Sequence, residues 1–466
     1  MRASRRVSSL SVVLLMLVGT LALEAGSLSA TASTPTASSP AVAAPAVVAK
    51  PAAAKTPWTP PAGVTINNPL GTVAQRTANL HKIRLAIQHS RKGSQITVAS
   101  WNIRSPNAEH DLILAQRRGV RVRVLMDRGN GNAKNVNPGF NNMQRQLRVG
   151  NAKRPSSMRS WAKECVSSCR GKSGISHTKM YLFSQVGQAT DVVMYGSANL
   201  TDLAATGQWN DLYTIRNRPD FYNFALGIFV EMTKDHAVAN AWQYLVEGGI
   251  NLGFLPWVGA GTSGDPVMNM LNQVHCTGAD QGAGNGGRTA IRIAQTAMTD
   301  SRGIALAKKL HQLWNQGCDI RVIYAVMGKQ VLQVFRTGGP RGPIPFRQVV
   351  QDFNGDFVYD RYLHTKVLAL SGVYGSNHHA EIAWNGSSNW TTVSLHSDDI
   401  FARIDSAALR MTYAKFVNRW FLHPPSSKTT VDGGNVGGAE ARRAVGSAAP
   451  VQAPAGVDRY AKIQVN

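Results

Sequence analysis

The stretch that decides the fold is residues 96–127, ITVASWNIRSPNAEHDLILAQRRGVRVRVLMD. Its first five residues are apolar enough to predict a strand, and a helix is expected to follow and to end at Gly119, a residue suited to a helix C-terminus. A second apolar run at 120–127 predicts another strand. A strand, a helix and a strand with short connections form a parallel unit, so this stretch predicts a sheet covered by helices.

The same order of elements returns further along the chain. The run AIRIAQ (290–295) predicts a strand, leucines at helical spacing predict a helix, and DIRVIYAVM (319–327) predicts the second strand. The glycines that end the two helices, Gly119 and Gly317, lie 198 residues apart. We therefore predict an α/β fold of two duplicated α/β/α halves, each a mixed sheet flanked by helices.

Each half then carries a His-x-Lys motif. His177-Thr178-Lys179 heads the segment HTKMYLF, and His364-Thr365-Lys366 heads HTKVLAL, 187 residues later. Because residues i and i+2 of a strand point to the same face, each histidine is expected to project together with its lysine.

A Gly-Ser turn and an acidic residue follow each motif. The turns contain Ser197 and Asn199 in the first half and Ser387 and Asn389 in the second, and their hydroxyl, amide and backbone N–H groups suit an anionic oxygen. Asp211 and Asp399 are the candidates to accept the second ring N–H of each histidine. Within Asn210-Asp211 and within Asp398-Asp399, the choice stays open by one position.

The doubled His-x-Lys and Gly-Ser-x-Asn pattern resembles the phospholipase D superfamily over most of residues 63–423. The resemblance implies that the halves pack about a pseudo-two-fold axis and share one active site, which transfers a phosphoryl group in two steps. It implies His177 as the nucleophile that forms a phosphohistidine and His364 as the acid and base, although this order stays open. Lys179 and Lys366, with Asn199 and Asn389, would hold the non-bridging oxygens. We expect no metal and no other cofactor.

One position departs from that family. The family motif has an aspartate seven residues after the histidine, where this chain has Ser184 and Ser371. That aspartate is generally regarded as structural, so its replacement bears more on the subfamily than on the chemistry, and it leaves room for a non-catalytic relative.

The ends of the chain predict export. Arg2, Arg5 and Arg6 precede a mostly apolar stretch, and Ala30-Thr31-Ala32 fits a cleavage site, so residues 1–32 are expected to be a secretory signal peptide and the mature protein to be secreted. Residues 33–62 are expected to be an Ala/Pro/Ser/Thr-rich linker, and residues 424–466 a disordered tail. Between them we place two halves, at 63–255 and 256–423, joined near residues 250–263.

Four cysteines remain in a chain expected to be exported. Cys165 and Cys169 are close enough in sequence for a local disulfide, which leaves Cys276 and Cys318 as a second pair. This spacing matches a zinc site poorly.

The charge favours an anionic partner. Lys and Arg number 50 against 26 Asp and Glu, a formal net charge of +24. Eight of the basic residues lie between Gln144 and Lys172, around Trp161, as an active-site loop or simply as a solvated basic loop.

Three functions fit these observations. A phospholipase D acting on phospholipid at a membrane surface is preferred, since one chain supplies both motifs and is expected to act as a monomer. A secreted nuclease with the same chemistry is the first alternative, and a non-catalytic protein that binds anionic polymers is the second.

Overall fold

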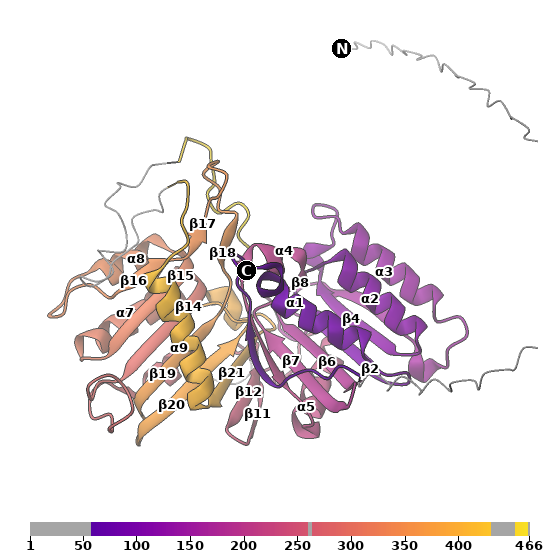
Figure 1. The fold of residues 1–466 in the computed structure, drawn as a ribbon, viewed down its shortest axis with the longest axis horizontal. Coiled ribbons are helices and arrows are strands. Elements are labelled where there is room, and N and C mark those ends of the chain that lie inside the picture. The colour runs from indigo at the N-terminus through magenta and orange to yellow at the C-terminus, as the bar shows by residue number, and fades with distance from the viewer. Residues whose placement is uncertain (1–56, 260–262, 430–452, 465–466) are drawn as a thin grey trace, which may run out of the picture. The chain divides into compact units, whose positions relative to one another are not determined.

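A computed structural model describes residues 57–259, 263–429 and 453–464 (Figure 1). The predicted signal peptide and most of the predicted linker lie outside the described residues. Among the residues that the structure describes, no helix combines the length and the hydrophobicity that crossing a bilayer requires.

The first sheet is built from both parallel and antiparallel strands. Strands β2 and β4 are parallel, as the strand–helix–strand pattern of residues 96–127 predicts, whereas β6 runs antiparallel to β2. In spatial order the strands are β1 (Gly63–Ile66), β10 (Asp211–Ile215), β7 (Ala189–Gly196), β6 (Lys179–Val186), β2 (Gln95–Ser100), β4 (Arg121–Asp127) and β5 (Trp161–Cys165).

Helices cover both faces of this sheet. On one face, alternate strand residues such as Ile96, Val98 and Phe183 pack against α1 (Val73–Gln88), α2 (Pro106–Arg117) and α3 (Pro138–Val149). Figure 1 shows α2 and α3 side by side over β4. The side chains that point the other way, including Leu182, pack against α5 (Pro219–Met232). Burial of apolar side chains on two faces gives the sheet its stability.

The second sheet has the same construction. Its strands are β11 (Gln243–Glu247), β12 (Ile250–Phe254), β21 (Ile400–Asp405), β20 (Asn377–Gly386), β19 (Val367–Tyr374), β14 (Ala290–Met298), β15 (Asp319–Met327) and β16 (Phe346–Gln348), with β13 (Val274–His275) paired to β19. One face packs against α6 (Pro266–Leu271), α7 (Asp300–Asn315) and α8 (Lys329–Arg336), and the other against α9 (Ala407–Leu422), which lies across the sheet in Figure 1.

The two sheets share a strand order. The order β10-β7-β6-β2-β4-β5 in the first corresponds to β21-β20-β19-β14-β15-β16 in the second, and β14 and β15 are parallel like β2 and β4. Shortly after α2 and α7 come Gly119 (φ +97°) and Gly317 (φ +110°), and this left-handed backbone conformation favours glycine. The predicted α/β architecture with mixed sheets and flanking helices is confirmed.

Two expectations about boundaries need correction. Strands β11 and β12 lie within the predicted first half, 63–255, but they extend the second sheet by pairing with β21. Residues 250–254 are therefore strand rather than linker. Within the stretch expected to be a disordered tail, 424–466, residues 453–464 pack on the second half. Ile463 is buried there, and Tyr359 N donates to Arg459 O at 2.9 Å.

Short strands connect the two halves near the motifs. β9 (Gln208–Trp209) from the first half pairs in parallel with β18 (Arg361–Leu363), which also pairs with β17 (Val350–Gln351). An isolated parallel bridge joins Ser176 to Asp398. The remaining short elements are α4 (Asp202–Thr206) and the paired strands β3 (Ile103–Arg104) and β8 (Leu200–Thr201). Both His-x-Lys motifs thus begin where one half hydrogen-bonds to the other.

Both predicted disulfides are present. Cys165–Cys169 closes a sequence separation of 4 residues, and Cys276–Cys318 closes one of 42. The second bond links the start of the second sheet to β15 across α7, whereas the first acts only locally.

We predict that the two disulfides contribute unequally to stability. The loop-entropy relation gives about 4 kcal/mol for the Cys276–Cys318 bond and about 2 kcal/mol for Cys165–Cys169. Urea unfolding of the matched double Cys→Ala variants should show the larger loss of unfolding free energy for Cys276/Cys318. An equal or reversed order would contradict this account of the two bonds.

Candidate active site

The first motif lies where β6 approaches the second half. His177 N donates to Asp398 O at 3.0 Å, and two residues later Lys179 begins β6. The rings of Trp101 and His177 meet edge to face, with centroids 5.6 Å apart. His177 and Lys179 are both fully buried, so the motif lies in the interior rather than on an exposed strand.

The second motif repeats this arrangement with the halves exchanged. His364 lies between β18 and β19, and its backbone N donates to Trp209 O at 2.9 Å, so the first half now supplies the acceptor. Thr365 Oγ1 donates to the same carbonyl at 2.9 Å. Thr365 therefore anchors the motif, while His364 and Lys366 are buried.

Each histidine ring is held by a residue from the opposite half. His177 Nδ1 lies 2.9 Å from Asp399 Oδ1, and His364 Nδ1 lies 2.8 Å from Asn210 Oδ1. The structure thus places Asp399 where a histidine partner was expected. For Asp211 the expectation is wrong, because the preceding residue, Asn210, holds the ring.

Asp211 has a different set of contacts. Its Oδ1 accepts from Ser197 Oγ at 2.8 Å, and its Oδ2 accepts from Tyr413 Oη at 2.8 Å. Asp211 is fully buried, and burial raises its pKa in spite of these hydrogen bonds. It thus anchors the turn that begins at Ser197, beside the site.

The two serines are also engaged differently from expectation. A hydroxyl has one hydrogen to donate, and Ser197 gives it to Asp211 while Ser387 gives it to Asp399. The predicted role of Ser197 and Ser387 as phosphate donors therefore needs correction. Their hydroxyls fix the carboxylates instead.

Other polar atoms of the site have no partner among the described residues. These atoms include Nε2 of His177, Nε2 of His364, both side-chain heteroatoms of Asn199 and Oδ2 of Asp399, all of them buried. Buried polar atoms are normally hydrogen-bonded, so this set indicates a place for a polar ligand. Asn389 is also buried, and its backbone O accepts from Arg302 Nη1 at 2.9 Å.

The lysines supply positive charge to the same place. Lys179 Nζ donates to His177 O at 2.7 Å, and Lys366 Nζ donates to His364 O at 2.6 Å. The charges of both lysines act on each histidine, and both motifs lie where the two halves are in contact. That the motifs form one active site stays a prediction.

Burial dominates the titration of these groups. It lowers the pKa of His177 to about 4, helped by the Lys179 charge and opposed by Asp399, and it lowers the pKa of Lys179 to about 7. Burial also lowers the pKa of Lys366 well below its usual value. For Asp399 burial acts to raise the pKa, but His177 and Lys179 outweigh it and hold the pKa low.

The serines that replace the family aspartate have structural contacts. Ser184 Oγ accepts from Gln95 N at 2.8 Å, and Ser371 Oγ accepts from Gly284 N at 2.8 Å. Neither contact involves a residue of the two motifs. The replacement therefore changes strand connections rather than the histidine site.

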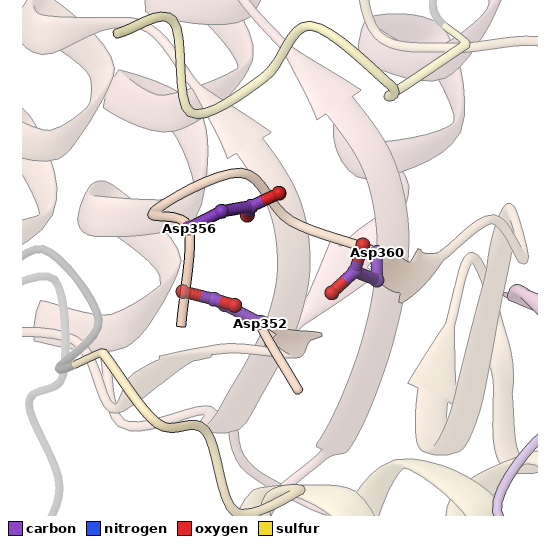
Figure 2. A group of neighbouring side chains, drawn as sticks. All are labelled: Asp352, Asp356 and Asp360. Carbon is purple, nitrogen blue, oxygen red and sulfur yellow. The ribbon is translucent and has the colours of Figure 1, made fainter. Parts of the chain in front are cut away.

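A group of carboxylates that could hold a metal ion lies elsewhere on the second half. Asp352, Asp356 and Asp360, in the loop between β17 and β18, bring ligand atoms within 4.8 Å of one another (Figure 2). Lys462 Nζ lies 2.6 Å from Asp360 Oδ1 and 3.7 Å from Asp356 Oδ2, so a lysine ammonium balances this charge. The contacts of the group join the loop to the C-terminal segment.

Two cavities lie on the two halves of the protein, one lined by aromatic side chains and one by basic side chains. The aromatic cavity, of about 330 Å³, has walls that include Trp242, Trp257, Trp384, Phe401 and Arg403. It shares Trp384 and Phe401 with a small cavity that reaches Lys366. The basic groove, of about 370 Å³, lies between α3 and β5 and is lined by Arg145, Arg148, Trp161 and Lys163 among others.

Comparisons with known proteins agree with this picture. Residues 83–228 match the profile of the family described as "Cardiolipin synthase, PLD-like domain". A phosphatidylserine synthase from Haemophilus influenzae superposes with a TM-score of 0.50 at 10% identity, over 77% of this chain and 85% of that one. No curated protein matches the sequence.

Two further solved structures are similar more loosely. A polyphosphate kinase from Porphyromonas gingivalis gives a TM-score of 0.48 at 12% identity, over 76% of this chain, which spans 49% of the kinase. Nuc from Salmonella typhimurium, a phospholipase D family member, gives 0.28 at 19% identity, over 38% of this chain and 98% of Nuc. The profile match shows a PLD-like domain within residues 83–228, and the chain shares its fold with the phosphatidylserine synthase.

We predict that the site binds a phosphate-like anion through its lysines. Lys179→Met and Lys366→Met keep the length of the side chain but remove its charge. Each should weaken tungstate binding at least about tenfold, a loss of about 1.4 kcal/mol in binding free energy. Isothermal titration measures the affinity. Lys82→Met is the matched control, because Lys82 is also buried but donates to Thr65 Oγ1. Unchanged affinity in both site variants would refute an anion site here.

Proposed function

We propose that this chain is a phospholipase D-type phosphodiesterase that works through a phosphohistidine. The observation that carries the proposal is the pair of buried Nε2 atoms, on His177 and His364, without a partner among the described residues and within the field of both lysines. A tetrahedral phosphate between two such rings meets a nucleophile on one side and a proton donor on the other.

In the first step His177 Nε2 attacks phosphorus. A P–N bond forms, the P–O bond to the leaving group breaks, and the cationic form of His364 gives its Nε2 proton to the departing oxygen. Asp399 accepts the Nδ1–H of His177, which keeps Nε2 free to attack and stabilises the ring as it becomes cationic.

In the second step water replaces histidine. His364, now neutral, takes a proton from the water as its oxygen attacks phosphorus, and the P–N bond to His177 breaks. Lys179, Lys366 and the amide of Asn199 stabilise the non-bridging oxygens, whose negative charge grows in each transition state. Hydrogen bonds already held by the histidine carbonyls keep the two ammonium groups in place.

For the substrate we propose a phospholipid, met outside the cell by a secreted enzyme. The aromatic cavity supports this choice, because it adjoins the cavity at Lys366 and offers indole and phenyl surface to an apolar part of a ligand. Tyr244, which lines this cavity, is 57% exposed, and Val246 on the same edge strand β11 is 58% exposed, which suits contact with a membrane surface.

The basic groove favours a second candidate, a nuclease with the same chemistry. Arg145, Arg148 and Lys163 could neutralise backbone phosphates, and Trp161 offers an aromatic ring for stacking. Two other basic residues of the run between Gln144 and Lys172 have structural roles instead. Arg154 donates to Gln116 O and Val120 O, and the buried Arg170 forms an ion pair with Glu231.

We predict that the mature protein releases choline from phosphatidylcholine vesicles and does so in EDTA, since two lysines supply the charge that a metal would supply. Choline release is measured alongside nicking of plasmid DNA under the same conditions. DNA nicking without choline release would replace the first candidate by the second. Activity that EDTA abolishes and a divalent ion restores would contradict the metal-free mechanism.

We also predict that His177→Ala and His364→Ala each lower kcat by at least about a hundredfold, because nucleophile and proton donor are both lost as whole functions. Rapid quenching and peptide mass spectrometry should find the phosphatidyl group on His177 in the parent protein. His378→Ala is the control, since that exposed histidine contacts Gly278 O. A phosphatidyl group on His364 instead would reverse the two roles, and normal turnover of either variant would exclude them.

A further inference from the structure

The two histidines occupy equivalent positions but have partners of different charge. In each case the backbone N–H of the histidine donates to a backbone carbonyl of the opposite half. The acceptor is Asp398 O for His177 and Trp209 O for His364. The next residue along then contacts the ring, and it is Asp399 in one case and Asn210 in the other. One ring faces a carboxylate, and the other faces an uncharged amide.

The amide of Asn210 is fixed in orientation. Its Nδ2 donates to Ala204 O at 3.0 Å and to Gln208 Oε1 at 3.1 Å, which uses both of its N–H bonds. Its Oδ1 must therefore face His364, and an oxygen can only accept. The hydrogen of the neutral His364 ring consequently lies on Nδ1, and its Nε2 lone pair points to the substrate site.

The charges around His364 do not replace the missing carboxylate. Lys366, Lys179 and His177 all act against a proton on its ring, whereas the backbone of Ser197 favours one. Asp211 has its carboxylate oxygens on Ser197 and Tyr413, and Asp399 is on His177. Burial is the largest influence, and with these neighbours it lowers the pKa of His364 well below the usual value.

We propose that Asn210 is a positioning residue that fixes the Nδ1–H tautomer of His364 and gives this ring an uncharged acceptor, where Asp399 gives His177 a carboxylate. This inference rests on the proposed phosphodiesterase chemistry. It makes the two histidines unequal: His177 is built to become a cation during attack, and His364 is built to be neutral at rest.

The leaving group decides how much this matters. An alkoxide leaving group needs the proton from His364, so its release should slow as the pH rises and that ring loses its proton. A phenolate carrying a nitro group leaves without help, so its release should depend little on His364. Choline release is therefore expected to be fastest at acidic pH, whereas nitrophenolate release should continue over a wider pH range.

The test is Asn210→Asp, which places a carboxylate beside His364 as Asp399 is placed beside His177. A charge at this distance should raise the pKa of His364, so that its proton persists to higher pH. The alkaline limb of kcat/KM for phosphatidylcholine should move up by about one to three pH units. With bis(p-nitrophenyl) phosphate the limb should stay where it is. An unmoved limb for phosphatidylcholine would overturn the proposal.

A second measurement does not depend on activity. In ¹⁵N-labelled protein at neutral pH, the His364 ring should give the shifts of the neutral Nδ1–H tautomer, and Asn210→Ala should release that preference. A cationic His364 ring, or an Nε2–H tautomer, in the parent protein would overturn the proposal. If the predicted tautomer is seen but no phosphodiester is cleaved, the proposed function fails while the role of Asn210 stands.

Discussion

The site depends on hydrogen bonds between the two halves at the histidine rings. His177 reaches Asp399 and His364 reaches Asn210, each across a separation of more than 150 residues in sequence. The backbone bonds from the same histidines to Asp398 O and Trp209 O hold both motifs in register with these partners. Neither half supplies both a histidine and the partner of its ring. The proposed chemistry therefore requires that the two halves are docked.

Burial makes the charges of this site unfavourable in free energy, and it also favours the binding of an anion. Two lysines and two histidines lie in the interior, where a charge is expensive unless it is balanced. The carboxylate of Asp399 compensates part of the positive charge of His177 and Lys179. The pKa values of Lys179 and Lys366 are nevertheless lowered, so this compensation is partial. A substrate phosphate would complete it, because its negative charge is what this site lacks. The protein thus keeps an unfavourable electrostatic environment that anion binding relieves.

Much of the architecture could be predicted from sequence, because strand patterns, capping glycines and paired cysteines act locally. The partner of His364 could not, since it depends on a one-residue shift: the chain pairs Trp209 with Leu363, which brings Asn210 rather than Asp211 to the ring. Between Asn210 and Asp211, a carboxylate is the more common partner of a catalytic histidine, so sequence reasoning selects Asp211. The half to which β11 and β12 belong could not be predicted either, because sequence order does not determine which sheet edge a hairpin joins.

The central claim is that both motifs form one phosphoryl-transfer site with His177 as the nucleophile. A crystal structure of the protein with orthovanadate tests it most directly, since vanadate adopts the geometry of the transferring phosphoryl group. The account predicts vanadium bonded to His177 Nε2, with His364 Nε2 within hydrogen-bonding distance of the opposite apical oxygen and both lysines on the equatorial oxygens. Vanadate bonded to His364, or bound only in the basic groove with the two rings apart, would contradict it.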